Sequence, residues 1–368
     1  MTAYLVFNAL REGKLALDQR LPVSERAWRE RGAAGPGPTP ANPARPGKAA
    51  RGAGKAPAPA PAQRKPAGRK PAVPAPSSAS LMFIDPTMKP TVEELLHGLI
   101  VQSGNDAAVA LAEGVAGSVE SFVAAMNRQA DTWGLKNTRY KNVTGLTEAG
   151  HHSSARDVAF IAGRIIAEHP RLHAIYAVKS YTYNGITQPN RNRLLARDPT
   201  VDGMKTGRTD AAGWCLVATA VRDTGAPSGS KRRLVSVVLG AASDDARAAE
   251  SAKLLDWGFS HWEAVRLFEP SQVLATVPVW KGRAGEARLG VAGALLVSVP
   301  RGDGPKLQST LTRTDPLIAP LAAGQAVGTV KVTLGGTAVT SVPLVAVQEV
   351  PLAGWFGRMW DSVRLRWH

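Results

Sequence analysis

Hydrophobic residues recur at helical spacing over much of the first half of the chain. The opening MTAYLVFNAL places Leu5, Val6, Phe7 and Leu10 on roughly one helical face, although no capping residue precedes them. After residue 80, four more stretches with this spacing predict helices over residues 91–102, 106–117, 118–134 and 153–170. The pattern therefore indicates a cluster of amphipathic helices.

Strand patterns replace helical ones beyond residue 179. Asn184-Gly185 within SYTYNGITQ is a strong hairpin signal. The apolar runs over residues 213–223 and 231–240 predict two antiparallel strands, and residues 244–259 predict one more helix. This region therefore has an α+β pattern, with an antiparallel sheet and a helical cluster.

Short alternating stretches, separated by turn residues, fill the chain from about Ala264 onward. They lie at residues 273–280, 295–300, 307–312 and 328–334. Such a pattern is typical of a small all-β domain. An α+β domain is therefore expected to be followed by a β domain.

The last residues, AGWFGRMWDSVRLRWH, predict an amphipathic helix. Tryptophan favours the headgroup zone of a bilayer, and arginine favours anionic lipid. We therefore expect a membrane anchor that lies on the membrane surface, with a helix docked on its own β domain as the alternative. One arc of this helix carries the apolar side chains of Trp355, Phe356, Met359, Trp360, Val363 and Trp367.

Residues 32–80 differ in composition from the rest of the chain. They are nearly all Ala, Pro, Gly, Lys and Arg, with Val73 as the only large aliphatic residue. Such a segment buries too little apolar surface to offset its ordering entropy, so we expect a disordered, extended insertion. Because it holds eight basic residues and no acidic one, tethering to an anionic polymer or lipid is a second interpretation.

Composition also excludes some classes of function. No run approaches the roughly 20 apolar residues of a membrane-spanning helix, so any membrane contact is expected to be peripheral. Half of the net charge of +16 comes from residues 32–80, and no basic helix or basic aromatic strand occurs elsewhere, so no nucleic acid partner is expected. His169 and His173, separated by Pro170 and without a third ligand, are expected to be a solvated pair and not a metal site. The single cysteine, Cys215, is expected to be a buried thiol in a strand.

A first short polar stretch, VQSGNDAA, carries candidate chemistry. Ser103, Gly104 and Asn105 are expected in a turn between two helices, with Asp106 placed to cap the second helix. Taken alone, Ser-x-Asn is common and is typical of an ordinary helix connection.

A second polar stretch, VDGMKTGRT, follows about a hundred residues later. Lys205, Thr206, Gly207 and Thr209 are expected just before a strand, where a fixed ammonium beside hydroxyls suits a carboxylate or an oxyanion. The order, separation and context of the two stretches match two elements of one known catalytic set.

With these motifs the chain resembles a serine D-alanyl-D-alanine carboxypeptidase, the peptidase S11 type of low-molecular-mass penicillin-binding protein. The resemblance implies a penicillin-binding-protein/β-lactamase-like transpeptidase fold of α+β class, then a small all-β domain and a C-terminal amphipathic helix. It implies no cofactor and no metal. Apart from the insertion it extends over essentially the whole chain, through residues 1–29, 92–113, 126–146, 183–195, 201–218, 254–259 and the Trp-rich tail.

The resemblance also divides the chain into segments. Residues 1–31 would begin a catalytic domain whose upstream part is missing, and residues 81–263 would complete it after the insertion at 32–80. Residues 264–350 would form the β-rich domain, and residues 351–368 the membrane-anchor helix.

The implied reaction removes the terminal D-Ala from peptidoglycan stem peptides through a serine acyl-enzyme. By the resemblance, Ser103 relays a proton toward the leaving amine and Asn105 orients the substrate amide. Lys205, assisted by Thr206 and Thr209, raises the positive potential and binds the terminal carboxylate region.

Three more residues enter the implied substrate site. Gly207 belongs to the Lys-Thr-Gly motif, and the backbone N–H of Arg208 would donate one oxyanion-hole hydrogen bond. Members of the family often carry His where Arg208 stands. Arg247 matches an arginine expected to hold the substrate carboxylate, with an ordinary solvated helix arginine as the alternative.

In this family a Ser-x-x-Lys element ends directly before the sequence that resembles MTAYLVF. Neither its acylated serine nor its lysine precedes Met1 here, and no secretory signal can be read at the start. We expect that Met1 is an internal methionine taken as a start, or that the gene is truncated. As written, the chain is expected to be inactive and to react with β-lactams only if the element is restored.

The implied partners are peptidoglycan stem peptides and the outer leaflet of the inner membrane, which places the protein at the periplasmic face. Two other functions stay open from the residues alone. One is a non-catalytic protein that binds cell wall or a partner, and the other is a class A β-lactamase-like hydrolase. The latter needs a deacylating glutamate on an omega loop, for which the sequence offers no convincing candidate.

Overall fold

The computed structural model describes residues 1–30, 80–223 and 231–365. The expected insertion lies outside the described residues except for Ser80, and Trp367 lies outside them as well. The chain divides into two compact units, and each has its own architecture. The first unit comprises Met1–Ala218 and Val237–Ala248, and the second comprises Thr219–Ser236 and Ala249–His368.

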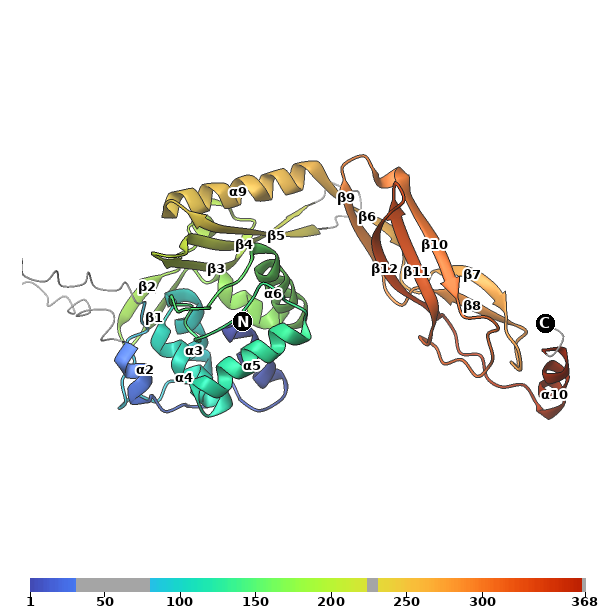
Figure 1. Ribbon diagram of the computed structural model, residues 1–368, viewed down its shortest axis with the longest axis horizontal. Helices are drawn as coiled ribbons and strands as arrows, with labels where there is room; N and C mark the ends of the chain where they lie inside the picture. The colour runs from blue at the N-terminus through green and yellow to red at the C-terminus, as the bar shows by residue number, and fades with distance from the viewer. Residues whose placement is uncertain (31–79, 224–230, 366–368) are drawn as a thin grey trace, which may run out of the picture. The chain divides into compact units, whose positions relative to one another are not determined.

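Helices are the most numerous elements of the first unit (Figure 1). A π-helical turn, Gly98–Gln102, continues the third helix, and a 3-10 turn, Ala174–Ala177, follows the seventh. The expected helical cluster is confirmed. Its helices are α1 (Thr2–Arg11), α2 (Glu25–Arg29), α3 (Val92–His97), α4 (Asn105–Ala116), α5 (Val119–Thr132), α6 (Ala155–Glu168), α7 (Pro170–His173) and α8 (Leu194–Arg197).

Side-chain caps define where several of these helices begin. Thr91 accepts a 3.1 Å hydrogen bond from the Glu94 N–H, and the Glu94 carboxylate accepts one of 2.7 Å from the Thr91 N–H, which forms a capping box before α3. Ser154 caps α6 as expected, accepting from the Asp157 N–H at 3.2 Å. The Asp157 carboxylate does not close the box, because it accepts from Thr138 Oγ1 at 2.7 Å.

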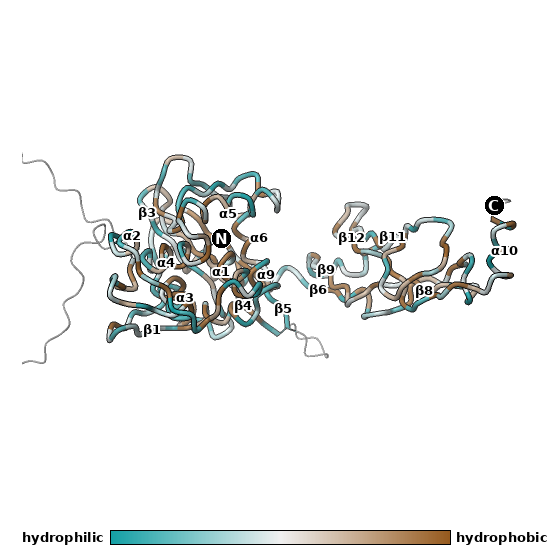
Figure 2. Tube along the Cα trace, turned by 90° about the horizontal axis from the view of Figure 1, so that it is seen from below, coloured by the Kyte–Doolittle hydropathy of each residue, from teal (hydrophilic) through white to brown (hydrophobic). Residues whose placement is uncertain are grey.

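α1 lies in the core of the first unit and has no side-chain cap. Its fully buried residues include Val6 and Phe7, as the spacing predicted, whereas Leu5 and Leu10 are only partly buried. Tyr4 and Ala9 take the remaining core positions, so the buried face is rotated from the expected one. In Figure 2, hydrophobic residues are frequent along α4, which packs against α1.

A hairpin and a three-stranded sheet follow α7 in the chain. β1 (Ser180–Tyr183) and β2 (Ile186–Pro189) form the predicted hairpin, in which Tyr183 pairs with Ile186 and both Asn184 and Gly185 have positive φ angles of 47° and 74°. The other sheet has the order β3-β4-β5, with bounds Val201–Thr209, Gly213–Asp223 and Lys231–Ala241. α9 (Asp244–His261) follows β5, as predicted.

The second unit is dominated by strands. β7, β8, β12, β11 and β10 form a five-stranded sheet, and β6 pairs with β9. Apolar side chains such as Leu289, Val330 and Leu344 are fully buried between these strands. The expected all-β domain is therefore confirmed. Its strands are β6 (Trp262–Phe268), β7 (Val273–Pro278), β8 (Glu286–Gly290), β9 (Leu295–Pro300), β10 (Leu307–Arg313), β11 (Ala326–Leu334) and β12 (Thr337–Ala346).

The chain then forms the predicted C-terminal helix, α10 (Trp355–Arg364). Hydrophobic and hydrophilic stretches alternate along it in Figure 2. None of its described residues is buried, and the Asp361 carboxylate accepts a 2.6 Å hydrogen bond from the Lys281 N–H. No single helix within the described ranges has the length and apolar character to cross a membrane, although α4 and α5, bent by 82°, pass that test as a pair.

Candidate active site

Ser103 lies at a sharp bend between two helical segments. The π-helical turn ends at Gln102, Ser103 has a left-handed backbone with φ of 62°, and α4 begins at Asn105. Between them, a Cβ on Gly104 would lie 2.8 Å from Asp106 Oδ1 and 2.9 Å from the Met82 nitrogen. Only glycine fits there, and the bend directs the Ser103 side chain into a cleft.

Lys205 reaches Ser103 from the sheet. Its Nζ donates a 2.8 Å hydrogen bond to Ser103 Oγ and one of 3.0 Å to the Thr206 carbonyl oxygen. The Lys-Thr-Gly motif was expected just before a strand, but it lies within β3, the first strand of the three-stranded sheet. The strand holds the lysine backbone in place, so the ammonium is fixed at the Ser103 side of the sheet.

The environment of Lys205 disfavours its charged form. Burial is the largest cause, followed by repulsion from the Arg191 and Arg247 guanidinium groups, and together they lower the pKa of Lys205 to about 7. A substantial fraction of the lysine is therefore neutral near pH 7. The surrounding cations also make the cleft attractive to a carboxylate.

Arg247 is one of the most buried charged residues of the first unit, at 4% exposure. Its Nη1 donates to the Gly207 carbonyl oxygen at 3.0 Å and to the Cys215 carbonyl oxygen at 3.2 Å, and its Nη2 pairs with Asp244 at 2.5 Å. The alternative of a solvated helix arginine is therefore wrong. The first turn of α9 uses this side chain to hold β3 and β4.

The residues expected at the site line one cleft of about 740 Å³. Asn105 and Thr206 are buried, whereas Arg208 is exposed and pairs with Asp210 at 2.8 Å. The cleft brings together Ser103, Asn105, Lys205, Thr206, Gly207, Arg208, Thr209 and Arg247.

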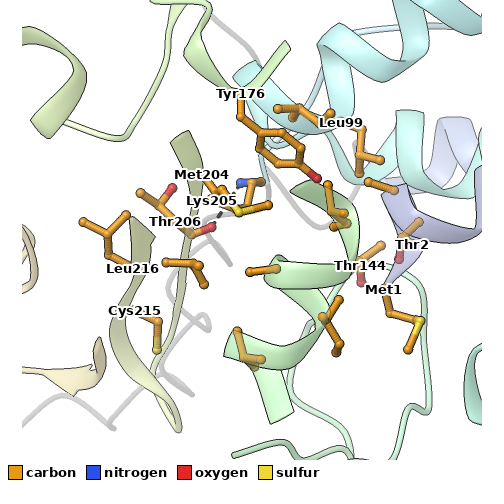
Figure 3. A pocket seen from close by; sticks show the side chains of 18 of the residues that line it. Met1, Thr2, Leu99, Thr144, Tyr176, Met204, Lys205, Thr206, Cys215 and Leu216 are labelled. Carbon is orange, nitrogen blue, oxygen red and sulfur yellow. Dashed lines mark hydrogen bonds between the residues drawn. The ribbon is translucent and has the colours of Figure 1, made fainter. Parts of the chain in front are cut away.

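An adjoining apolar cavity of about 320 Å³ lies beside the first turn of α1. Figure 3 shows Met1 and Thr2 on one side of this cavity and Met204, Lys205 and Thr206 on the other. The start of α1 and the Lys205 motif therefore share one cavity.

Several other residues of the cleft were not singled out from the sequence. Among them are Ser80, Arg191 and Trp214, and the Arg247 guanidinium lies 4.9 Å from the centre of the Trp214 ring. The stretch PNRNR, which carries Arg191 and Arg193, was a signal for a cationic site, because both arginines line the cleft. Nothing local marked Ser80 or Trp214.

Asp106 has a larger role than the expected helix cap. It is fully buried, and its carboxylate accepts hydrogen bonds of 2.8 to 3.2 Å from the N–H groups of Met82, Phe83 and Ile84 and one of 2.9 Å from Ala107. Burial raises its pKa, and these backbone donors oppose the shift. Asp106 thus fastens the segment after Ser80 to the start of α4.

Two smaller expectations are wrong. Cys215 lies in β4 as predicted but is only partly buried, and it lines the apolar cavity. His169 and His173 are buried, not solvated, at 5% exposure each. His169 Nε2 lies 2.9 Å from Asn8 Oδ1, so it helps to pack α1 against α6 and α7.

Comparison with known proteins identifies the family. The D-alanyl-D-alanine carboxypeptidase model of peptidase S11 matches residues 67–243, and the model of the penicillin-binding protein 5 C-terminal domain matches residues 262–352. D-alanyl-D-alanine carboxypeptidase DacC of Escherichia coli (strain K12) is 40% identical over 370 residues, which cover all of this chain and 80% of that protein. The chain belongs to the D-alanyl-D-alanine carboxypeptidase family. This is a family of serine-type hydrolases, so the expected enzyme class is confirmed.

Solved structures agree with this assignment. Penicillin binding protein 5 from Haemophilus influenzae has a TM-score of 0.74 and 34% identity, covering 95% of this chain and 88% of that one. Penicillin-Binding Protein D2 from Listeria monocytogenes, in the cefotaxime bound form, has a TM-score of 0.50 and 26% identity over 70% of this chain and 83% of that one. The expected fold class of the carboxypeptidase family is confirmed.

Proposed function

We propose that the cleft binds the free C-terminus of peptidoglycan stem peptides that end in D-Ala-D-Ala. One observation carries the proposal: Lys205 Nζ lies 2.8 Å from Ser103 Oγ inside a cleft that Arg191 and Arg247 also line. A peptide carboxylate suits such a cluster of cations, because charge-assisted hydrogen bonds are the stronger class. The relatives named as D-alanyl-D-alanine carboxypeptidases support the choice of peptide.

Each cleft residue then has a chemical role. Lys205, Thr206 and Thr209 hold the terminal carboxylate region, and the Asn105 carboxamide orients the substrate amide. Ser103 passes a proton toward the leaving amine, and the Arg208 N–H donates to the oxyanion. Arg247 acts mainly as a positioning residue, because its donors are engaged with the carbonyl groups of β3 and β4 and with Asp244.

Peptide binding tests the proposal directly. A short peptide that ends in D-Ala-D-Ala is compared by calorimetry with the same peptide bearing a C-terminal amide. The free acid should bind at least about tenfold more tightly, because a hydrogen bond to a charged group contributes about 1.5 to 3 kcal/mol. Equal affinities for the acid and the amide would contradict the proposal.

Covalent labelling tests the expectation from the sequence that the 368-residue chain does not react with β-lactams. Fluorescent penicillin should not label the 368-residue chain stoichiometrically. A variant with an N-terminal extension that carries Ser-x-x-Lys directly before Met1 should be labelled once per chain. Stoichiometric labelling of the unextended chain would show that it holds a β-lactam-reactive nucleophile of its own.

We further propose that α10 attaches the protein to an anionic membrane surface, at the periplasmic face of the inner membrane. The support is its exposed apolar row, in which Phe356 is 76% and Trp360 65% exposed, beside Arg358 and Arg364. Such a composition suits the headgroup region of a bilayer. α10 contacts the β domain through the hydrogen bond between Asp361 and Lys281, and this contact leaves the apolar row exposed.

A further inference from the structure

Ser103 and Lys205 together have the geometry of a nucleophile and its base. Ser103 is half-buried, lines the cleft, and shares a 2.8 Å hydrogen bond with Lys205 Nζ. Serine and lysine form the whole nucleophile–base pair in some hydrolases of unrelated fold. In the proposed function, Ser103 only passes a proton to the leaving amine. Its oxygen does not attack a substrate carbon in that role.

The backbone at Ser103 holds the hydroxyl in an unusual place. Its φ of 62° and ψ of 34° lie in the left-handed region, which is uncommon for a residue with a side chain. The residue stands between the π-helical turn and the N-terminus of α4, a helix of 12 residues. Serine nucleophiles occur at strained turns just ahead of a helix, where the hydroxyl is presented to solvent and near the positive end of the helix.

Lys205 is suited to take the proton from this hydroxyl. A base at the Ser103 oxygen must lie within about 3.2 Å and must be neutral for part of the time at the working pH. The hydrogen bond meets the first condition. Burial and the nearby arginines, which lower the pKa of Lys205 to about 7, meet the second.

Asn105 is the candidate donor for the negative charge that forms during attack. It follows Ser103 by two residues and lines the same cleft. Asparagine side chains serve as oxyanion donors in acyl transfer, with a contribution of about 10² to 10³ in rate. Nucleophile, base and donor are therefore neighbours in one cleft.

We propose that Ser103 is itself an acyl-accepting nucleophile, with Lys205 as its base, toward small activated esters and fluorophosphonates. Ser103 Oγ bonds to the carbonyl carbon while its proton passes to Lys205 Nζ. The intermediate collapses as the bond to the leaving alkoxide breaks, and the Lys205 ammonium returns the proton to that oxygen. Water then hydrolyses the seryl ester, which releases the acid and restores the hydroxyl.

We expect Ser103 to react with activated acyl compounds, because their leaving groups depart without full protonation by the protein. A p-nitrophenolate leaves without full protonation, whereas a peptide amine must be protonated as its bond breaks. A small ester also approaches Ser103 without an anchored carboxylate. The inference uses the same cleft as the proposed function but does not depend on its peptide ligand.

The test labels the 368-residue chain with a fluorophosphonate probe and maps the adduct by mass spectrometry, with p-nitrophenyl acetate hydrolysis as a second readout. We expect one adduct per chain, on the peptide that contains Ser103, at a rate that rises with pH around 7 as Lys205 loses its proton. Lys205→Met should slow labelling at least about 100-fold, since a general base contributes about 10² to 10⁴. An adduct that maps to another residue would overturn the proposal.

Two serine variants separate chemistry from folding. Ser103→Gly removes the hydroxyl but suits the positive φ, so it should keep the melting temperature and lose the adduct. Ser121→Ala removes an exposed hydroxyl of α5 that does not line the cleft, and it should keep the adduct. If a folded Ser103→Gly protein is labelled at the original rate, Ser103 is not the nucleophile.

Peptide binding, measured on the same samples, keeps the two proposals apart. Binding of the D-Ala-D-Ala peptide without any fluorophosphonate adduct at pH 9 would overturn the nucleophile and leave the proposed function intact. An adduct at Ser103 without peptide binding would support the nucleophile and contradict the proposed function.

Discussion

The Lys205 ammonium donates a 2.8 Å hydrogen bond to the Ser103 hydroxyl, although the two residues are 102 positions apart in the chain. This contact joins the bend before α4 to the sheet that begins with β3. It also fixes the position of a partly buried lysine whose charged form is disfavoured. Several consequences of this arrangement can be measured.

Lys205→Met should stabilise the protein at neutral and lower pH. The pKa of Lys205 is about 7 in the folded protein and 10.5 in the unfolded chain, so protonation of Lys205 favours unfolding. This destabilisation is complete below about pH 7. It decreases as the pH rises from 7 to 10.5, because the unfolded chain also loses the proton over this range. Because Lys205 is partly exposed, we expect Lys205→Met to raise the free energy of unfolding by on the order of 1 to 2 kcal/mol.

Melting temperatures of the parent and the Lys205→Met protein, measured from pH 6 to pH 10, check this prediction. The difference should be largest at pH 6 and should shrink toward pH 10. Lys253→Met is a matched control, because Lys253 is exposed and pairs only with Glu250 at 2.7 Å. A constant difference across the pH range would show that Lys205 keeps an ordinary pKa.

Asp106→Ala should unfold the connection between the segment after Ser80 and α4. The change leaves the N–H groups of Met82, Phe83 and Ile84 without their acceptor in a buried site. Each unsatisfied buried donor costs about 1 to 3 kcal/mol, so we expect a loss of at least about 3 kcal/mol. Denaturant unfolding measures the loss, and hydrogen exchange should show early opening at residues 82–84.

Asp131→Ala is the matched control for that change. Asp131 is exposed, and its pair with Arg139 is long at 3.6 Å, so the cost should stay within about 0.5 kcal/mol. Similar losses for the two variants would mean that Asp106 does not hold the segment.

Local signals predicted much of the fold. Apolar periodicity and polar caps indicated α1 and α3 to α6, Asn184-Gly185 indicated the hairpin, and the Trp-rich row indicated α10. These elements form from contacts between residues that are close in sequence, so a short window carries the information.

The errors concern contacts between distant residues. The motif VDGMKTGRT is polar and contains two glycines, so its own residues do not favour a strand, and β3 forms because it pairs with β4. The burial of Arg247 depends on carbonyl groups in β3 and β4, and the role of Asp106 depends on a segment more than twenty residues upstream. The sequence predicted the cleft only because the stretches around Ser103 and Lys205 both match elements of one known catalytic set.

Arg247→Met should weaken both stability and peptide binding. The change removes the buried partner of Asp244, although Asp244 keeps its pair with Arg193 at 2.6 Å. It also leaves one carbonyl oxygen of β3 and one of β4 without the Arg247 donor. Loss of one member of a buried ion pair costs about 3 to 5 kcal/mol, and we expect the low end because Asp244 is partly exposed. Arg197→Met, at an exposed pair with Asp245, should cost less than about 1 kcal/mol.

Denaturant unfolding and calorimetry with the D-Ala-D-Ala peptide check the Arg247 prediction. Stability and affinity should fall together, because displacement of β3 moves Lys205 and Thr206 as well. A variant with normal stability but lost affinity would instead indicate direct contact between Arg247 and the peptide carboxylate.

Binding of the protein to lipid vesicles should depend on the apolar row of α10. The double variant Phe356→Ser, Trp360→Ser removes its most exposed aromatic side chains, each of which contributes roughly 1.5 to 3 kcal/mol on burial. Affinity for vesicles of phosphatidylglycerol and phosphatidylcholine should therefore fall at least about 100-fold. Sedimentation with vesicles measures the change.

The salt dependence of vesicle binding and a control variant on the β domain test the same proposal. Parent binding should weaken as salt rises, because Arg358 and Arg364 act on anionic headgroups within a Debye length. Leu311→Ser replaces an apolar side chain of β10 that is 37% exposed and should leave vesicle binding unchanged. If the double variant binds as tightly as the parent, the exposed aromatic side chains of Phe356 and Trp360 do not attach the protein to the membrane.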